Sequence, residues 1–317
     1  ASDILEVHDT DWSNETTSND NTSTGDYRLF PSLGAVYNKY SCGTNRFIVS
    51  VSTSTSAGKA RVYDYNTETD EWGRFAANGS FTKDGSHSFD KSGLVGHYGK
   101  YCAMSLDDKT IAIGGYYDAN GRGVMHVYKY DEETAEWGRF NVDGSFTPGE
   151  FYNLSNTSNN WSGYYVYSKR INLSADGTRL SFGAHGNSNQ GRIYVMDYDE
   201  ETAAWGRKYA DGTFKPYVEN DFTTMTVFDG TSFGSTNFGN FSFMSADGKT
   251  LSVSRHVSSN HGYCYVWKFN DETMQWGKWN TDGTFTPVPA NSDGKLISMT
   301  SSAYYDLERN SASTNYG

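Results

Sequence analysis

Apolar and polar residues alternate along several short stretches of the chain, and turn-forming residues separate these stretches. In one of them, apolar Leu180 and Phe182 alternate with polar residues directly after the turn signal Asp176-Gly177. A period of two residues is typical of a strand with one buried face, and Asp-Gly favours a hairpin turn. No stretch approaches 18 consecutive apolar residues, about the length a membrane-spanning helix needs. The pattern therefore predicts an all-β protein without such a helix.

One long segment occurs four times. Each copy starts with a strand of alternating aromatic and polar residues, passes through Glu-Thr and Trp-Gly, and ends at a phenylalanine. The four copies cover residues 61–81, 126–146, 193–214 and 265–285. Their tryptophans, Trp72, Trp137, Trp205 and Trp276, are 65, 68 and 71 residues apart. Self-similarity at such a period is the signature of a repeat architecture.

A second shared block precedes each of these segments. It covers 105–115, 173–184 and 244–254, with a degenerate copy at 42–51. Together the two blocks predict two strands joined by a hairpin turn, a third strand after a loop, a turn at Glu-Thr, and a fourth strand starting at Trp-Gly. A four-stranded antiparallel sheet cannot bury both faces alone, and radial stacking of such sheets as blades solves this problem. We therefore expect a β-propeller of four-stranded antiparallel blades.

The two chain ends carry half-repeats. Residues 292–300 match the first block, and residues 4–12 resemble a shortened second half with Trp12. We expect one propeller domain over 1–317, with repeats at 27–90, 91–150, 151–216 and 217–287. A fifth blade, split between 1–26 and 288–310, would close the ring. Four, six or seven blades are the alternatives, because the short hairpins after Trp-Gly could count as extra strands.

The blocks resemble the FG-GAP type of propeller repeat, which is known from integrin-like heads and from extracellular repeat proteins of algae and bacteria. The opening aromatic-glycine pair matches Tyr98-Gly99 and Phe238-Gly239, and residues 174–184 match the core; Leu33-Gly34 and Ser162-Gly163 depart from it. The resemblance implies extracellular adhesion or scaffolding. Calcium binding is not expected from the resemblance, because neither candidate loop matches the calcium loop of the family. Residues 118–121 lack the acidic ligand that should follow them, and Asp197-Tyr-Asp199 lacks a glycine at the turn.

Charge and processing signals narrow the choice of partners. The net charge is −12 and the pI is about 5.0, which disfavours binding to nucleic acid or to an anionic membrane. The first residue is Ala1 rather than Met, which we interpret as a processed N-terminus of an extracellular or cell-surface protein. Eight glycosylation sequons are present, at Asn14, Asn21, Asn78, Asn153, Asn156, Asn160, Asn172 and Asn240.

The three cysteines, Cys42, Cys102 and Cys264, form no disulfide framework. Cys42 and Cys102 occupy corresponding strands of successive repeats and could be bridged. Buried free thiols are the alternative.

Differences between the repeats indicate where a binding site would lie. The loops after the second strand vary, and so do the connections 85–97, 149–161 and 216–237; variable loops on a rigid scaffold commonly carry function. The expected ligand-binding residues are Tyr116, Tyr117, Asp118, Trp161, His185, Arg255 and His256. The repeated Glu68, Glu133, Glu201 and Glu272 and the repeated tryptophans are interpreted as turn and packing residues. His185, His256 and His261 lack the spacing of a metal site, and no catalytic motif is present.

The sequence thus favours a non-enzymatic extracellular module for recognition, adhesion or structural assembly. It would bind protein or glycan through its variable loops, or assemble with copies of itself in a matrix or filament, without a cofactor. The alternative is a propeller-fold enzyme that acts on glycans as a hydrolase or lyase.

Overall fold

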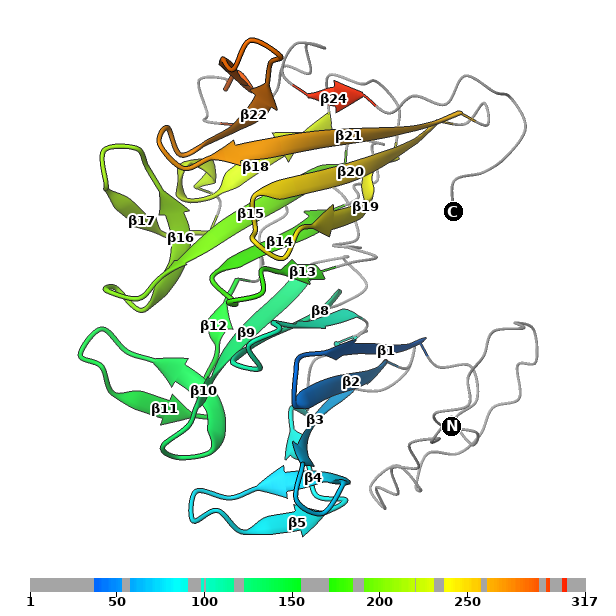
Figure 1. Ribbon diagram of the computed structural model, residues 1–317, viewed down its shortest axis with the longest axis vertical. Coiled ribbons are helices and arrows are strands. Elements are labelled where there is room, and N and C mark those ends of the chain that lie inside the picture. The colour runs from blue at the N-terminus through cyan, green and yellow to red at the C-terminus, as the bar shows by residue number, and fades with distance from the viewer. Residues whose placement is uncertain are drawn as a thin grey trace.

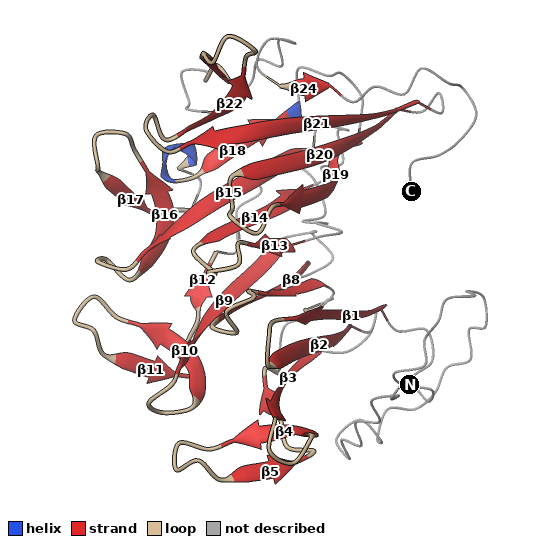
Figure 2. Cartoon of the chain, viewed as in Figure 1, coloured by secondary structure: helices blue, strands red, loops and turns tan. Residues whose placement is uncertain are grey.

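The computed structural model describes residues 37–52, 58–90, 98–99, 101–116, 123–154, 171–184, 191–219, 221–230, 237–257, 261–290, 295–296 and 304–306. These residues form strands and turns (Figure 2); they include the short 3-10 turn η2 at Phe222–Thr224 and no α-helix. None of the described segments is a helix long and apolar enough to cross a bilayer. The strands make four antiparallel sheets, which confirms the predicted all-β fold.

Each sheet consists of five strands in consecutive order and one short strand added to its middle. The first sheet contains β1 (Tyr37–Cys42), β2 (Arg46–Ser52), β3 (Lys59–Asn66), β4 (Glu71–Phe75), β5 (Phe81–Lys83) and β6 (His87–Ser88). The second contains β7 (Tyr101–Met104), β8 (Thr110–Tyr116), β9 (Gly123–Asp131), β10 (Glu136–Phe140), β11 (Phe146–Pro148) and β12 (Tyr152–Asn153).

The other two sheets repeat this plan. The third contains β13 (Ile171–Leu173), β14 (Arg179–Ala184), β15 (Arg192–Asp199), β16 (Ala204–Lys208), β17 (Phe214–Pro216) and β18 (Thr226–Asp229). The fourth contains β19 (Asn237–Met244), β20 (Thr250–Val257), β21 (His261–Asn270), β22 (Gln275–Trp279), β23 (Phe285–Pro287) and β24 (Tyr305–Asp306).

The outer edge of each third strand is shared by two strands. In the first sheet, β4 pairs with the end of β3 at Asp64–Asn66, and β6 pairs with an earlier part at Arg61 and Val62. The strands β12, β18 and β24 occupy the place of β6 in the other sheets. Each sheet therefore has a short strand and an added hairpin that the four-stranded prediction did not include.

The four sheets stack side by side along the long axis of the molecule (Figure 1), and the innermost strands β1, β7, β13 and β19 pack against one another in succession. Apolar side chains fill the space between neighbouring sheets. The clusters contain Ile48, Val62, Ile111 and Tyr128 between the first and second sheets, Val127, Leu180 and Met196 between the second and third, and Ile193, Leu251 and Trp267 between the third and fourth.

A largely covered cation links each of the first three sheets to the next. Arg46 of the first sheet donates a hydrogen bond of 3.0 Å to the carbonyl oxygen of Asp108, and its guanidinium carbon lies 3.6 Å from the ring centre of Tyr130. Both acceptors belong to the second sheet. The equivalent contacts are Lys129 with Gly177 (3.0 Å) and Tyr198 (4.2 Å), and Arg179 with Gly248 (3.0 Å) and Phe269 (3.9 Å).

The Trp-Gly motif starts the fourth strand of each sheet as predicted, and its tryptophans pack between sheets. Trp137, Trp205 and Trp276 are 2–3% exposed, whereas Trp72 is only half-buried. The glycine is required by space: a Cβ at Gly73 would lie 2.2 Å from the carbonyl oxygen of Thr82 and against the Phe81 ring. The same contacts recur at Gly138, Gly206 and Gly277, which explains why the repeat contains Trp-Gly and a later Phe.

The predicted fifth blade is not established. Residues 1–26 lie outside the described part of the chain. Of 288–310, Leu296 forms a bridge to Phe228 of the third sheet, and Tyr305–Asp306 completes the fourth sheet as β24. The strands β12, β18 and β24 also extend their sheets past the predicted repeat ends at 150, 216 and 287, because strands of two to four residues leave no readable alternation. Closure of the ring through the termini stays a prediction.

We expect the Trp205→Ala variant to lose about 3–5 kcal/mol of unfolding free energy, because the substitution leaves a cavity between two sheets. The Trp72→Ala variant should lose clearly less, since the side chain of Trp72 is half-exposed. Chemical denaturation of both variants checks this ranking. If both variants lost the same unfolding free energy, burial between sheets would not be the way in which the tryptophan stabilises the protein.

The contribution of Lys129 to stability should rise with pH in the alkaline range, measured against a variant that lacks it. Burial lowers the pKa of Lys129 to about 8, below the ordinary value of about 10.4. Between these values the unfolded state binds more protons, so raising the pH favours the folded state by up to roughly 3 kcal/mol. The Lys129→Met variant should lack this rise. Denaturation curves at pH 7.5 and pH 10 compare the two proteins, and parallel pH profiles would contradict the expectation.

Candidate functional site

The predicted ligand-binding residues are only partly within the described structure. Tyr116 ends β8, and Arg255 and His256 lie on β20. Tyr117, Asp118, Trp161 and His185 lie outside the described residues. The proposed binding face thus stays a prediction for most of its members.

Arg255 is part of the aromatic packing of the fourth sheet. Its Nη1 donates to the hydroxyl of Tyr265 at 3.2 Å, and its guanidinium lies 5.1 Å from the ring centre of Tyr263. Tyr263 and Tyr265 are stacked, and Tyr304 meets Tyr265 edge-on. These contacts give Arg255 a structural role in the long β20–β21 hairpin.

The remaining candidates have mixed outcomes. No disulfide joins Cys42 to Cys102 in the described structure: Cys42 is exposed, and Cys102 is half-buried against the inter-sheet core. Among the sequons, Asn78 and Asn153 are exposed, and the Asn172 amide donates to the hydroxyls of Ser181 and Ser242. Of Asn240 only the backbone in β19 is described; Asn14, Asn21, Asn156 and Asn160 lie outside the described residues. Glycosylation stays a prediction.

The repeated glutamates are exposed at the turns, as their interpretation as turn residues implies. The acceptor that holds each turn is the preceding Asp or Asn. Asp131 Oδ2 accepts from the amide and hydroxyl of Thr134 at 3.1 and 2.7 Å, and Asn270 Oδ1 accepts from the amide of Glu272 at 2.9 Å. The carboxylates of the repeated glutamates therefore do not converge on a shared site.

One position on each sheet, which in the first three sheets faces the next sheet, differs from repeat to repeat. The short strands β6, β12, β18 and β24 each place one residue opposite an equivalent valine of the third strand. We call these places junctions one to four; they are occupied by His87, Tyr152, Thr226 and Tyr305.

Tyrosine at a junction has a structural role. The hydroxyl of Tyr152 accepts from the amide of Phe140 at 3.0 Å, donates to its carbonyl at 3.2 Å, and contacts the hydroxyl of Tyr198 at 2.9 Å. Tyr305 bonds the amide and carbonyl of Trp279 in the same way. The side chain fills the junction and fixes the end of the Trp-Gly strand.

Junction one contains a buried imidazole between two carboxyl groups. His87 Nε2 lies 3.2 Å from Oδ2 of Asp64, and Nδ1 lies 3.8 Å from Oε2 of Glu136. The side chains of His87 and Asp64 are each 3% exposed, whereas that of Glu136 is 39% exposed. The first distance is that of a hydrogen bond and the second is longer, so Nδ1 faces the accessible side of the junction without being held there.

Two arginines complete junction one. Arg46 Nε donates to Oδ1 of Asp64 at 2.6 Å, and Arg74 forms an ion pair with Glu136. Burial of Asp64 opposes its ionisation, but hydrogen bonds from His87 and the Phe75 amide, with the charges of His87 and Arg46, outweigh burial and lower its pKa. Asp64 is therefore a fixed anion that orients the imidazole. No group of three or more potential metal ligands occurs among the described residues.

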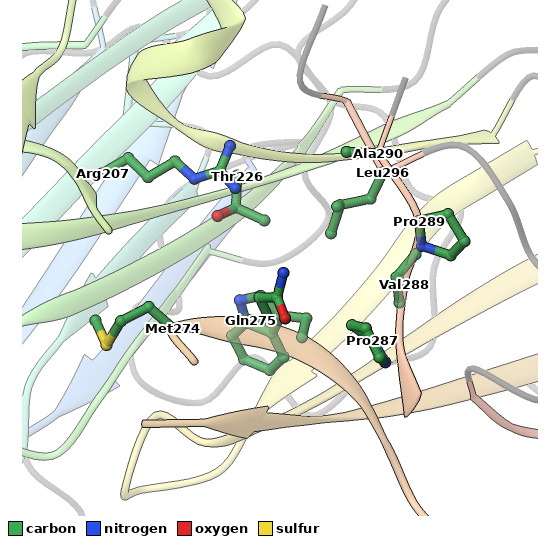
Figure 3. A pocket seen from close by; sticks show the side chains of 10 residues that line it. Arg207, Thr226, Met274, Gln275, Pro287, Val288, Pro289, Ala290 and Leu296 are labelled. Carbon is green, nitrogen blue, oxygen red and sulfur yellow. The ribbon is translucent and has the colours of Figure 1, made fainter. Parts of the chain in front are cut away.

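Junction three is open. Thr226 is much smaller than tyrosine, and a cavity of about 160 Å³ lies beside it between the third and fourth sheets (Figure 3). Arg207 and Gln275 line the cavity together with apolar residues. Arg207 follows Trp205 as Arg74 follows Trp72, and Gln275 precedes Trp276 as Glu136 precedes Trp137. Junction three is thus junction one with the histidine and the glutamate replaced by smaller or neutral residues.

Sequence reasoning missed both junctions. His87 and Thr226 lie in the variable connections 85–97 and 216–237, which were identified as candidates in general, but no residue in them was selected. The signal was weak, because the short strands carry no pattern that would align His87, Tyr152, Thr226 and Tyr305 with one another.

No model of a known protein family and no curated protein matches the sequence. Solved structures similar to the chain include the periplasmic gluconolactonase of Pseudomonas aeruginosa (15% identity, TM-score 0.34, 79% of this chain and 70% of that one). The β-propeller domain of the trilobed protease of Pyrococcus furiosus is another (9% identity, TM-score 0.32, 81% and 84%). A third is prolyl oligopeptidase B of Galerina marginata (10% identity, TM-score 0.39, 80% and 32%), of which the chain spans about a third.

The four antiparallel sheets, with their first strands packed in succession, give the chain a β-propeller fold. The expectation of a non-enzymatic module, which rested on the resemblance to FG-GAP repeats, is corrected: the similar structures include a gluconolactonase and an oligopeptidase, and a fold alone does not fix a function.

The Asp64→Asn variant should lose about 3–5 kcal/mol of unfolding free energy, because it leaves the Arg46 charge without its buried partner. The matched control is Asp197→Asn in the third sheet, where Asp197 pairs with Arg179 at 2.6 Å but is 19% exposed and has no histidine beside it. The control should lose less. Since the pKa of Asp64 is lowered, its contribution is full above about pH 4 and disappears as the pH falls through the folded-state pKa. Chemical denaturation at pH 7 and pH 3 measures the unfolding free energy that Asp64→Asn loses relative to the wild type. Equal losses at the two pH values would contradict a contribution from the ionised Asp64.

Proposed function

We propose that this chain is a propeller-fold enzyme that acts on a glycan by acid–base chemistry at junction one. The observation that carries the proposal is the placement of His87, held by buried Asp64 on one side and facing half-exposed Glu136 on the other. Histidine is the side chain best suited to proton transfer near neutral pH. Of the four junctions, the first alone has a residue of this kind.

Each residue of junction one has a different role in the proposed reaction. Asp64 orients the imidazole, because its carboxylate is fixed by Arg46 and the Phe75 amide. In hydrolysis, His87 accepts at Nδ1 a proton from the water that attacks the sugar; in elimination, it accepts the proton of the ring carbon beside a sugar carboxylate. In both cases the glycosidic C–O bond breaks and the departing oxygen takes up a proton from the imidazolium or from water. Arg74 and Glu136, at the surface, bind the hydroxyl groups of the substrate.

Activity on a panel of neutral and acidic polysaccharides, followed by the appearance of reducing ends and of unsaturated products, tests the proposal. The His87→Tyr variant is the sharpest comparison, because tyrosine stands at this position in the second and fourth sheets and preserves its packing role. We expect it to fold but to melt below the wild type, because Asp64 already holds the Phe75 amide that a tyrosine would bond, and to lose 10²- to 10⁴-fold in kcat/KM, the usual contribution of a general base. The Glu136→Gln variant should lose activity as well.

The matched control is Tyr305→His, which puts a histidine in a junction without a facing Glu and should leave activity unchanged. A wild-type protein that releases no product from any glycan, or a His87→Tyr variant as active as the wild type, would overturn the assignment.

We also infer that the repeats are of the FG-GAP type. The two matching aromatic-glycine pairs support this: Tyr98 and Phe238 are buried, and Gly99 and Gly239 have positive φ angles of 75° and 77°. A glycine after the buried aromatic is thus needed for the backbone conformation. The type of repeat supports an extracellular location and carries no information on the substrate.

A further inference from the structure

Junction three contains an arginine whose counter-ion is missing. At junction one, the guanidinium of Arg74 pairs with the carboxylate of Glu136. At junction three, the equivalent pair is Arg207 and Gln275, and Gln275 is neutral. Within the described part of the chain, Arg207 makes no ion pair or side-chain hydrogen bond; its guanidinium only lies 4.9 Å from the ring centre of Tyr209.

The space beside Arg207 is of a size and composition for a small organic molecule. The cavity measures about 160 Å³, close to an apolar cavity of about 150 Å³ that accommodates benzene in another protein. Apart from Arg207, Gln275 and Thr226, its lining is apolar, with Trp276, Val288 and Leu296 among the residues. Figure 3 shows Arg207 and Thr226 at one end of the cavity and Val288, Pro289 and Leu296 at the other.

We propose that this cavity binds a small carboxylic acid with an apolar body, its carboxylate taking at Arg207 the place that the Glu136 carboxylate takes at Arg74. A planar guanidinium matches a carboxylate with two parallel hydrogen bonds. The hydroxyl of Thr226 and the amide of Gln275 are further donors at the same end. The apolar body lies against Trp276 and Leu296, whose contact with it removes apolar surface from water.

The site is separate from junction one. It lies between the third and fourth sheets, whereas His87 and Glu136 join the first and second. Binding at junction three is therefore independent of the proposed acid–base function and is measured without any turnover.

Calorimetric titration of the full chain with benzoate, and with benzamide as its neutral isostere, tests the proposal. We expect benzoate to bind with a dissociation constant below about 1 mM and benzamide to bind at least about tenfold more weakly, since hydrogen bonds to charged groups are the stronger ones. Equal affinities would overturn carboxylate recognition. No heat with either compound would overturn the site.

Three variants locate the binding. Arg207→Gln should lose at least about tenfold in benzoate affinity and leave benzamide unchanged. Gln275→Glu supplies the carboxylate found at junction one and should block benzoate by pairing with Arg207. Thr226→Tyr introduces the residue of junctions two and four and should exclude both compounds while the protein melts no lower than the wild type. Unchanged benzoate binding in Arg207→Gln or in Gln275→Glu would overturn the proposal even if Thr226→Tyr failed to fold.

Discussion

The stacking of the four sheets involves one recurring contact, a largely covered cation that reaches from each of the first three sheets under a turn of the next. The turn carbonyls at Asp108, Gly177 and Gly248 belong to residues with positive φ angles, and each accepts a hydrogen bond from the preceding sheet; that of Gly177 accepts a second one from the Thr110 hydroxyl. A long cationic side chain supplies the donor and covers an aromatic ring at the same time. The cation contacts both a turn carbonyl and an aromatic ring of the next sheet, so it restricts the distance and the rotation between the two sheets. The apolar clusters and the junctions lie between sheets arranged in this way.

The source of this cation alternates along the chain. In the first and third sheets it is an arginine of the second strand, paired across to an aspartate of the third strand: Arg46 with Asp64, and Arg179 with Asp197. In the second sheet the roles are exchanged, and Lys129 of the third strand lies opposite Thr110. Among the described residues, Lys129 thus makes no ion pair with a carboxylate of its own sheet, and its burial lowers its pKa to about 8.

The alternation also explains why the junctions differ. Asp64 is present because Arg46 requires it, and only with a buried aspartate at this place can His87 be held as an oriented imidazole. In the second sheet, lysine at the same position leaves no acceptor, and Tyr152 bonds the backbone instead. In the third sheet, Asp197 is bonded to Arg179 and the small Thr226 leaves the junction open. The candidate acid–base site of the first sheet therefore depends on the Arg46–Asp64 pair, which also helps to join the first sheet to the second.

The parts of the fold that could be predicted from the sequence are those with a regular pattern of residues. The strand alternation, the Asp-Gly hairpins and the Trp-Gly start of the fourth strand follow from patterns of two residues or from the repeat itself, and the structure has them. The sequence did not predict β6, β12, β18 and β24, because strands of two to four residues are defined by their partner rather than by their own pattern. Since His87 and Thr226 lie on these strands, the junctions could not be seen before the pairing was known.

If the predicted fifth blade joins the fourth sheet by the same cation contact, it must have two specific groups. Lys268 occupies in the fourth sheet the position of Lys129 in the second, opposite Thr250, and its Nζ donates to the Thr250 hydroxyl at 2.7 Å. In the first three sheets the corresponding cation reaches a turn carbonyl and an aromatic ring of the following sheet; among the described residues, nothing follows the fourth. A closing blade must therefore present a turn carbonyl and an aromatic ring to Lys268, and a segment that lacks either cannot continue the ring by the same interaction.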